Sequence, residues 1–306
     1  MSWFKQIKQQ WLGLIVATPA LVKVLGFFSI WVVCWLPIAI PLAHWLSWHP
    51  LQPLQTSQKL YLITSLYLIA PVIISGAIRY SQKFWSSYGV SLTNFTNILI
   101  SLVIGIALAL GGLAIAFLLE NALGWVDWEA ESWLKLVDIS IPILLLALFI
   151  GACEELIFRG FIQTELQEDY SPLIATVITS SIFAVSHLVW EWDKTLPEVP
   201  GLWLLGVVLT QARWVNGGNL SLAWGLHAGW VWGLTCLDTA QILVYTGKGS
   251  EWFTGWGGNP LAGGSGIFCL LLTAVAIQLL PFPDPLPSMP QVMTMVRGLT
   301  KDREVG

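Results

Sequence analysis

Long apolar runs joined by short polar connections make up most of the chain. Eight runs can be distinguished, near residues 24–46, 59–78, 96–119, 138–161, 172–190, 201–215, 220–238 and 265–281. An α-helix needs about 20 apolar residues to cross the hydrocarbon core of a bilayer, so six of these runs are long enough. The runs 201–215 and 265–281 are short, and we expect the first to be a broken or tightly packed helix. The pattern predicts an all-α fold, a polytopic transmembrane helix bundle of about eight spanning helices.

Composition supports a protein that resides in the lipid bilayer. Of the 306 residues, 56% are hydrophobic and only 10% are charged, whereas soluble domains carry about 25% charged residues. The net charge of −4 offers no basic surface for nucleic acid. All 4 cysteines lie in apolar runs without a CxxC pair, so we expect neither a disulfide nor a thiolate metal site.

The distribution of positive charges predicts the orientation. With eight spans and the N-terminus inside, ten of the 14 lysines and arginines lie on the cytoplasmic side, as the positive-inside rule requires. The four on the other side are Lys59, Lys135, Lys194 and Lys248. We therefore expect a multi-pass protein of the plasma or inner membrane, or of another internal membrane, with both termini cytoplasmic.

The ends of the chain differ from its centre. Trp3, Phe4, Ile7 and Trp11 lie near helical spacing with lysines between them, which predicts an amphipathic segment on the membrane surface. The run PFPDPLPSMP leads into a polar tail. The expected parts are an amphipathic segment at 1–23, N-terminal transmembrane helices at 24–130, a second membrane domain at 131–283 and a cytoplasmic tail at 284–306.

Three charged residues interrupt the end of the fourth apolar run, in the stretch ACEELIFRGF. A charge at the centre of a bilayer costs roughly 2.5–3.5 kcal/mol, so these side chains need partners. Residues four apart share a face of a helix, and we expect Glu155 to pair with Arg159. Glu154 points about 140° away from Arg159, which leaves it free to face another group.

Two of the 4 histidines also lie in apolar runs. His187 ends the stretch ITSSIFAVSH, one turn after Phe183, and His227 lies within LSLAWGLHAGWVWGL. Polar side chains inside a membrane usually face the bundle interior or a water-filled cavity. His44 and His49 lie among tryptophans at the end of the first run, and this boundary position explains them without a functional role.

Glycines accompany His227. Gly225, Gly229 and Gly233 are spaced by four, the small-xxx-small pattern that lets two membrane helices approach closely. The pattern predicts a helix contact with His227 near its edge. It leaves open whether His227 is a functional group or a packing residue that bonds to a carbonyl.

One carboxylate and two imidazoles could act together in two ways. Glu154 can serve as a general base on water, while His187 and His227 polarise a carbonyl and stabilise an oxyanion. The same three side chains could instead bind zinc and leave one position for water. No HExxH motif occurs, which excludes an ordinary zincin.

These residues resemble the three motifs of the CPBP family of intramembrane proteases, which includes CAAX prenyl proteases of the Rce1 type and bacterial Abi proteins. EELIFRG resembles the EExxxR motif, FAVSH the FxxxH motif, and LHAGWV the histidine motif that follows. The order and spacing of the motifs agree as well. The resemblance covers residues 138–240 and implies that 131–283 is a catalytic membrane domain that hydrolyses peptide bonds.

The resemblance also implies a role for each residue. Glu154 corresponds to the glutamate that activates water, His187 to the histidine that assists it, and His227 to the histidine that stabilises the oxyanion or contributes to a metal site. The supporting residues correspond to Glu155, Arg159 and Phe183. If the activity is metal-dependent, zinc is the implied cofactor, with Glu154, His187 and His227 as its ligands. A metal-independent glutamate mechanism is the alternative.

One position departs from the family pattern. The third motif continues with Asn or Asp four residues after the histidine, where this chain has Val231. Valine cannot donate a hydrogen bond to an oxyanion, and losing one such donor can cost about 10²–10³-fold in rate. Asp238 lies roughly 16 Å further along the helix, and Asn219 precedes the helix. Val231 leaves open a slower enzyme, another donor or a non-catalytic relative.

Depth in the membrane presents a difficulty. Counted at about 1.5 Å per residue from the expected inner boundary, Glu154 lies on the order of 15 Å deep, His227 about 10 Å and His187 about 24 Å. These side chains can meet only if the helices tilt or end several residues from the expected boundaries.

The predicted function is an intramembrane endopeptidase, a CAAX protease-like metalloendopeptidase if it needs zinc, that acts on a peptide or membrane-protein substrate. One alternative is a non-catalytic membrane scaffold or immunity protein of the same family, which Val231 favours. A proton-coupled transporter is less favoured, because no inverted repeat is found. The glycine-rich loop 245–266 is expected to be flexible or to lie at the interface, rather than to act as a lid.

Overall fold

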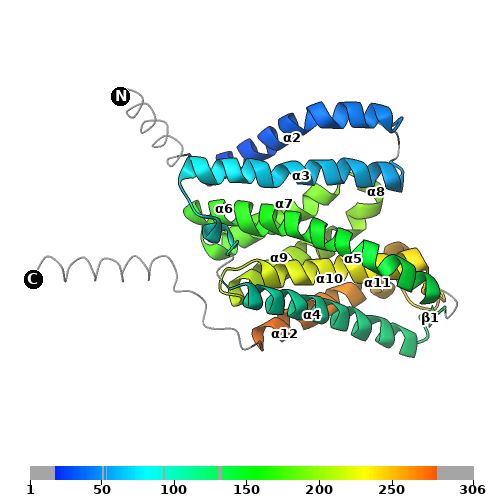
Figure 1. Ribbon diagram of the computed structural model, residues 1–306. Coiled ribbons are helices and arrows are strands. Elements are labelled where there is room, and N and C mark those ends of the chain that lie inside the picture. Colours follow the sequence, from blue (N-terminus) through cyan, green and yellow to red (C-terminus); the bar gives the residue numbers. More distant parts are fainter. Residues whose placement is uncertain (1–17, 50–51, 53, 92–93, 130–132, 281–306) are drawn as a thin grey trace, which may run out of the picture.

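The computed structural model describes residues 18–49, 52, 54–91, 94–129 and 133–280. Its long helices are α2 (Ala20–Trp45), α3 (Thr56–Ser81), α4 (Phe95–Ala122), α5 (Trp133–Glu155), α7 (Pro172–His187), α9 (Val199–Val215), α10 (Ser221–Ala240) and α12 (Gly264–Gln278). In Figure 1, α2 and α3 form one side of the bundle and α4 and α12 the other, with α5, α7, α9 and α10 between them. The predicted all-α architecture is confirmed.

Each of the eight apolar runs contains one of these helices. Among the described residues, four helices are long and apolar enough to cross a membrane, namely α2, α3, α4 and the continuous helix Trp133–Asp169. Helices α7 and α12 are shorter apolar helices, and the number of about eight spans stays a prediction. The run 201–215 is unbroken, and α9 is tightly packed, since residues from Gly201 to Arg213 along it are buried.

The fourth helix is longer than its apolar run. Helix α5 passes directly into a π-helical segment, η3 (Leu156–Ile162), and then into α6 (Gln163–Asp169). The next helix begins at Pro172, where Ser171 accepts a hydrogen bond from the backbone N–H of Ile174, a favourable N-cap followed by proline at the first position. The predicted end at residue 161 was therefore wrong, and eight further residues extend the helix to Asp169.

The glycine spacing on α10 produces the predicted close helix contact. A Cβ on Gly225 would collide with the backbone of Leu102 on α4, and a Cβ on Gly229 would lie 2.7 Å from Cβ of Ala109. On the opposite helix, Gly105 leaves the same room for the backbone of Leu222. Helices α4 and α10 thus pack backbone to backbone, and this contact fixes the position of α10 in the bundle.

A cluster of ion pairs lies at one end of the bundle, here called the Lys23 end. Lys23 lies 3.3 Å from Glu165 and 2.5 Å from Glu168, while Lys83 lies 2.7 Å and 2.5 Å from the same two carboxylates. The Tyr88 hydroxyl, in the 3₁₀ turn η1 (Trp85–Tyr88), donates to Glu165, and burial together with this bond raises the pKa of Tyr88. These pairs fasten α2 and the α3–α4 connection to α6.

The opposite end of the bundle has a separate polar cluster. Glu191 accepts hydrogen bonds from Lys59 and Lys194 at 2.6 Å and 3.2 Å, next to the short helices α8 (Trp192–Thr195) and η4 (Leu196–Glu198). Lys23 and Lys59 therefore lie at opposite ends, as the predicted topology requires. Which end faces the cytoplasm stays a prediction.

The loop 245–266 is folded and not flexible, and its position at the membrane interface stays a prediction. Strands β1 (Val126–Trp128) and β2 (Leu243–Tyr245) form an antiparallel pair. The short helices α11 (Glu251–Thr254), η5 (Trp256–Gly258) and η6 (Pro260–Ala262) follow. Leu261 packs against Gly201 of α9, and Pro260 packs against Gly266 of α12, so this segment closes one end of the bundle as a packed part of the fold.

The predicted amphipathic segment 1–23 lies largely outside the described residues, and its last part, from Ala20, belongs to α2. The predicted tail 284–306 lies entirely outside the described residues.

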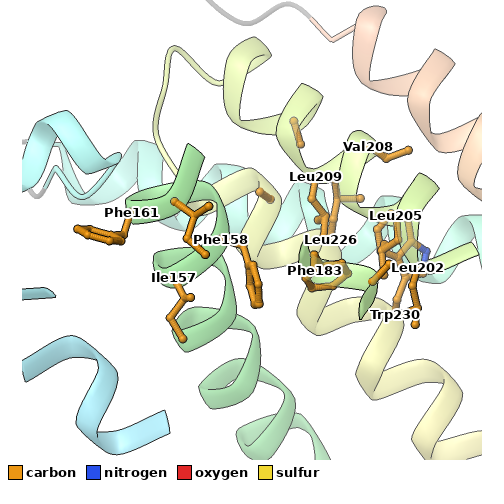
Figure 2. Close-up of a cluster of buried hydrophobic side chains, with 14 of the residues drawn as sticks. Ile157, Phe158, Phe161, Phe183, Leu202, Leu205, Val208, Leu209, Leu226 and Trp230 are labelled. Carbon is orange, nitrogen blue, oxygen red and sulfur yellow. The ribbon is translucent and has the colours of Figure 1, made fainter. Parts of the chain in front are cut away.

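Close to the π-helical segment, a buried apolar cluster joins η3 to α7, α9 and α10 (Figure 2). In this cluster Phe158 and Phe183 make an edge-to-face contact with ring centroids 5.0 Å apart. Phe183 of this cluster also contacts the guanidinium of Arg159.

Candidate active site

The charged motif lies where the fourth helix changes from α to π geometry. Glu154 and Glu155 end α5, and Arg159 lies within η3. Single π turns in α-helices occur frequently at functional sites because they shift side chains and carbonyls from their α-helical positions. Here the guanidinium of Arg213, from α9, donates to the backbone carbonyl of Arg159 and also, at 3.0 Å, to the hydroxyl of Thr164. Arg213 thus supplies a hydrogen-bond donor to the π segment from a neighbouring helix.

Glu155 pairs with Arg159 as the helix spacing indicated. Oε1 of Glu155 lies 3.0 Å from Nη1 of Arg159, and both side chains are fully buried. The guanidinium carbon lies 4.3 Å from the ring centroid of Phe183, a cation–π arrangement that also compensates a buried charge. The same Oε1 of Glu155 lies 2.7 Å from Nδ1 of His227. Glu155 therefore neutralises Arg159 and orients His227.

Glu154 faces the other way, towards both histidines. Its Oε1 accepts a hydrogen bond from the hydroxyl of Tyr67 on α3. Its Oε2 is buried and has no hydrogen-bond partner among the described residues. That oxygen lies 3.5 Å from Nε2 of His227 and 3.9 Å from Nε2 of His187. The three predicted catalytic side chains thus converge on one point, from α5, α7 and α10.

The hydrogen bonds of the histidine rings indicate which nitrogen carries the proton. Nδ1 of His187 lies 2.8 Å from the carbonyl of Phe183, and a carbonyl can only accept. Nδ1 of His227 likewise faces the carboxylate of Glu155. The distances from Nε2 to Glu154 exceed those of direct hydrogen bonds. In their neutral forms both rings therefore direct an Nε2 lone pair towards Oε2 of Glu154.

Exposure differs among the three side chains. Those of Glu154 and His227 are each 5% exposed, whereas that of His187 is 30% exposed. Phe183 separates the histidines from the interior, with its centroid 4.6 Å from the ring of His187 and 6.1 Å from that of His227. His187 is therefore the most exposed of the three groups.

The donor set has the chemistry of a zinc site, since it combines an unpartnered carboxylate oxygen with two imidazole lone pairs. In the part of the chain that the structure describes, however, no group of three His, Cys, Asp or Glu side chains has the arrangement of a metal site. Zinc as a cofactor therefore stays a prediction.

The positions considered as replacements for the missing motif amide lie elsewhere. The Asn219 side chain accepts a hydrogen bond from the backbone N–H of Ser221, the first residue of α10. Asp238 is exposed and lines a cavity of about 1180 Å³ at the far end of α10. Val231 follows His227 by one turn and presents only carbon atoms. None of the three donates to the site.

Tyr67, like Arg213, is a contributor that the sequence analysis missed. It lies in α3, in the apolar stretch YLITSLYLIAP, where a tyrosine gives no signal of its own. Its contact with Glu154 joins residues 87 positions apart. The contact arises from the packing of α3 against α5, which the sequence alone does not predict.

These features define a multi-pass α-helical membrane protein with a buried carboxylate–imidazole site. Residues 136–233 match the family model described as type II CAAX prenyl endopeptidase Rce1-like. The chain therefore contains an Rce1-like domain, which confirms the resemblance to the CPBP proteases. No curated protein and no solved structure matches the chain significantly.

The matched region extends from α5 to α10 and includes Glu154, His187 and His227. Helices α2, α3 and α4 lie outside it, and so does Tyr67. The match of this region to the Rce1-like model is evidence for protease activity.

Proposed function

We propose that the protein is an intramembrane endopeptidase in which Glu154 activates water against a peptide bond. The observation that carries this proposal is the unpartnered Oε2 of Glu154, which lies between Nε2 of His187 and Nε2 of His227. Oε2 of Glu154 and Nε2 of His187 suit a water molecule, which can donate one proton to each and present its lone pair to a carbonyl carbon.

The reaction begins with a water molecule that donates to Oε2 of Glu154 and to Nε2 of His187. Glu154 removes one proton as the water oxygen attacks the carbonyl carbon of the substrate. The C–N bond then breaks, and the proton passes from Glu154 to the leaving amine. The products are a carboxylic acid, which loses its remaining proton to water, and a free amine, with no covalent enzyme intermediate.

His227 is suited to the oxyanion that forms during this attack. When its Nε2 carries a proton, the ring can donate to the oxyanion, because Glu155 beside Nδ1 balances the added charge. Arg159 in turn keeps Glu155 ionised and in place. Every step uses side chains of this chain, and none requires a metal.

The proposed substrate is a peptide or a segment of a membrane protein that enters from the exposed side of His187. The proposed location is the plasma or inner membrane, or another internal membrane, with both termini in the cytoplasm. The positive charges at the Lys23 end support this orientation.

A second candidate, a non-catalytic scaffold or immunity protein of the same family, is favoured by Val231. This residue puts carbon atoms where the family motif has an amide or carboxyl group. Glu154, His187 and His227 nevertheless converge on one point, an arrangement that a scaffold does not require.

The test is cleavage of a library of quenched fluorescent peptides by the purified full-length protein in detergent, beside Glu154→Gln and Glu120→Gln. Glu120 is a buried carboxylate of α4 outside the site, which makes it a matched control. Cleavage by wild type and Glu120→Gln, but not by Glu154→Gln, is expected. Equal signals from wild type and Glu154→Gln would reject the proposal.

A chelator arm of the same assay separates the two mechanisms. We expect activity to survive prolonged treatment with a zinc chelator, because the proposed steps use only the side chains of Glu154, His187 and His227. Activity that disappears with the chelator and returns with added zinc would instead make Glu154, His187 and His227 metal ligands.

A further inference from the structure

Tyr67 brings a hydroxyl from α3 into the site. Its O–H donates to Oε1 of Glu154, and no other side chain among the described residues bonds to that carboxylate as a donor. A carboxylate presents two equivalent oxygens and can rotate to exchange them. The bond from Tyr67 removes this equivalence, so that Oε1 is occupied and Oε2 faces the histidines.

Helix α2 holds Tyr67 in place. The ring of Trp31 stacks on that of Tyr67, with centroids 6.1 Å apart and an interplanar angle of 19°. The indole N–H of Trp31 donates at 2.8 Å to the carbonyl of Leu66, the residue before Tyr67. Trp31 is itself buried. Contacts with Trp31 of α2 thus help to hold the Tyr67 ring, and with it the hydroxyl, in its orientation towards Glu154.

The position of this hydroxyl matters for the reaction proposed above. A general base must keep one lone pair aimed at the water that it deprotonates, and a displacement of about 1 Å can cost about 10²-fold in rate. Without the Tyr67 bond, Glu154 is free to turn either oxygen towards α3 and away from His187 and His227.

We propose that Tyr67 is a positioning residue that selects Oε2 of Glu154 as the reactive oxygen, and that the N-terminal helices therefore complete the site of the Rce1-like domain. This inference rests on the proposed function and adds to it a residue outside the matched region 136–233. Tyr67 acts through Glu154 and does not touch the substrate.

The test compares Tyr67→Phe with Tyr80→Phe in the full-length protein. Tyr80 lies on the same helix and is 47% exposed, so its hydroxyl is a matched control. We expect Tyr67→Phe to lower kcat roughly 10- to 100-fold while KM stays within about twofold, because substrate binding is unaffected. Tyr80→Phe should match wild type. An unchanged kcat, or a loss expressed only in KM, would overturn the inference.

A second measurement does not depend on activity. Thermal unfolding in detergent is compared for Tyr67→Phe, Glu154→Met and the double variant. Because methionine cannot accept the bond, the two single shifts in Tm should sum to more than the shift of the double variant. Additive shifts would overturn the inference even for an active enzyme. A wild type that cleaves no peptide, combined with non-additive shifts, would reject the proposed function and leave the orienting bond established.

Discussion

Glu155 holds His227 and Arg159 with the same carboxylate oxygen. Oε1 lies 2.7 Å from Nδ1 of His227 and 3.0 Å from Nη1 of Arg159, and all three side chains are buried. One atom therefore couples the charge balance of the π-helical segment to the orientation of a ring in the site. Variants of Glu155 should affect stability and activity together.

Replacement of Glu155 by leucine should destabilise the protein by about 3–5 kcal/mol, because it leaves Arg159 buried without a counter-charge. Thermal unfolding of the purified protein in detergent measures this loss. The double variant Glu155→Leu/Arg159→Met removes both charges and should unfold at a higher temperature than Glu155→Leu alone. If the double variant were less stable than the single one, the ion pair would not be the source of the effect.

The two histidines should differ in how their loss affects cleavage. His187→Ala removes an acceptor for the attacking water and should lower kcat about 10²–10⁴-fold. His227→Ala removes the oxyanion donor and should cost about 10²–10³-fold. His44 is an exposed histidine near the end of α2, and His44→Ala serves as the control. Wild-type rates in both site variants would remove the histidines from the mechanism.

Restoring the amide of the family motif should raise the rate. Val231 and His227 are four residues apart on α10 and share a face, so Val231→Asn offers a new donor beside the ring. We expect kcat to increase about 10-fold, part of what one oxyanion donor contributes. Val231→Leu, which adds volume without a donor, should give no increase. A decrease in kcat with asparagine at unchanged Tm would show that the oxyanion lies elsewhere.

The contact between α4 and α10 should tolerate no added carbon. Gly225→Ala places a Cβ against the backbone of Leu102 and should cost about 1–3 kcal/mol of stability. Gly111→Ala in α4 is the matched control, because nothing lies within 4 Å of a Cβ there. That change should be neutral or stabilise by up to about 1 kcal/mol, since alanine favours helix. Equal Tm values for the two variants would contradict the close packing.

The sequence predicted the helices and the pair formed by Glu155 and Arg159, but it misjudged depth. Because the fourth helix continues to Asp169, Glu154 lies 15 residues before its end, and His187 lies 15 residues after the start of α7 at Pro172. Glu154 and His187 thus both lie about 22 Å from the turn that joins α6 to α7, so the expected difference in depth between these two residues disappears. The apolar run ends at residue 161, although the helix continues, because the following turns carry Glu165 and Glu168, which pair with lysines at the Lys23 end.

His227 reaches the same level for a different reason. It lies only six residues into α10, whose first residue is Ser221. The preceding helix carries Arg213, which bonds to the backbone carbonyl of Arg159 and to Thr164. The connection between α9 and α10 therefore lies beside residues 159–164 of the fourth helix, deeper in the bundle than the end of α6 at Asp169. No sequence pattern indicates this difference in depth, because it arises from contacts between helices.

The strands β1 and β2 were not predicted for a related reason. Each has three residues, too few for an alternating pattern to be recognised. The hydroxyl of Tyr67 likewise depends on two helices meeting. Sequence motifs identify residues that carry chemistry, and packing decides what each of them faces.

The ion pairs at the Lys23 end impose an order on biosynthesis. Lys23 and Lys83 belong to the first part of the chain to be made, whereas Glu165 and Glu168 follow about eighty residues or more later. Until the ribosome has delivered α6, both lysines lack these carboxylates. The contacts that fasten α2 and the α3–α4 connection to α6 can therefore form only after α6 has been synthesised.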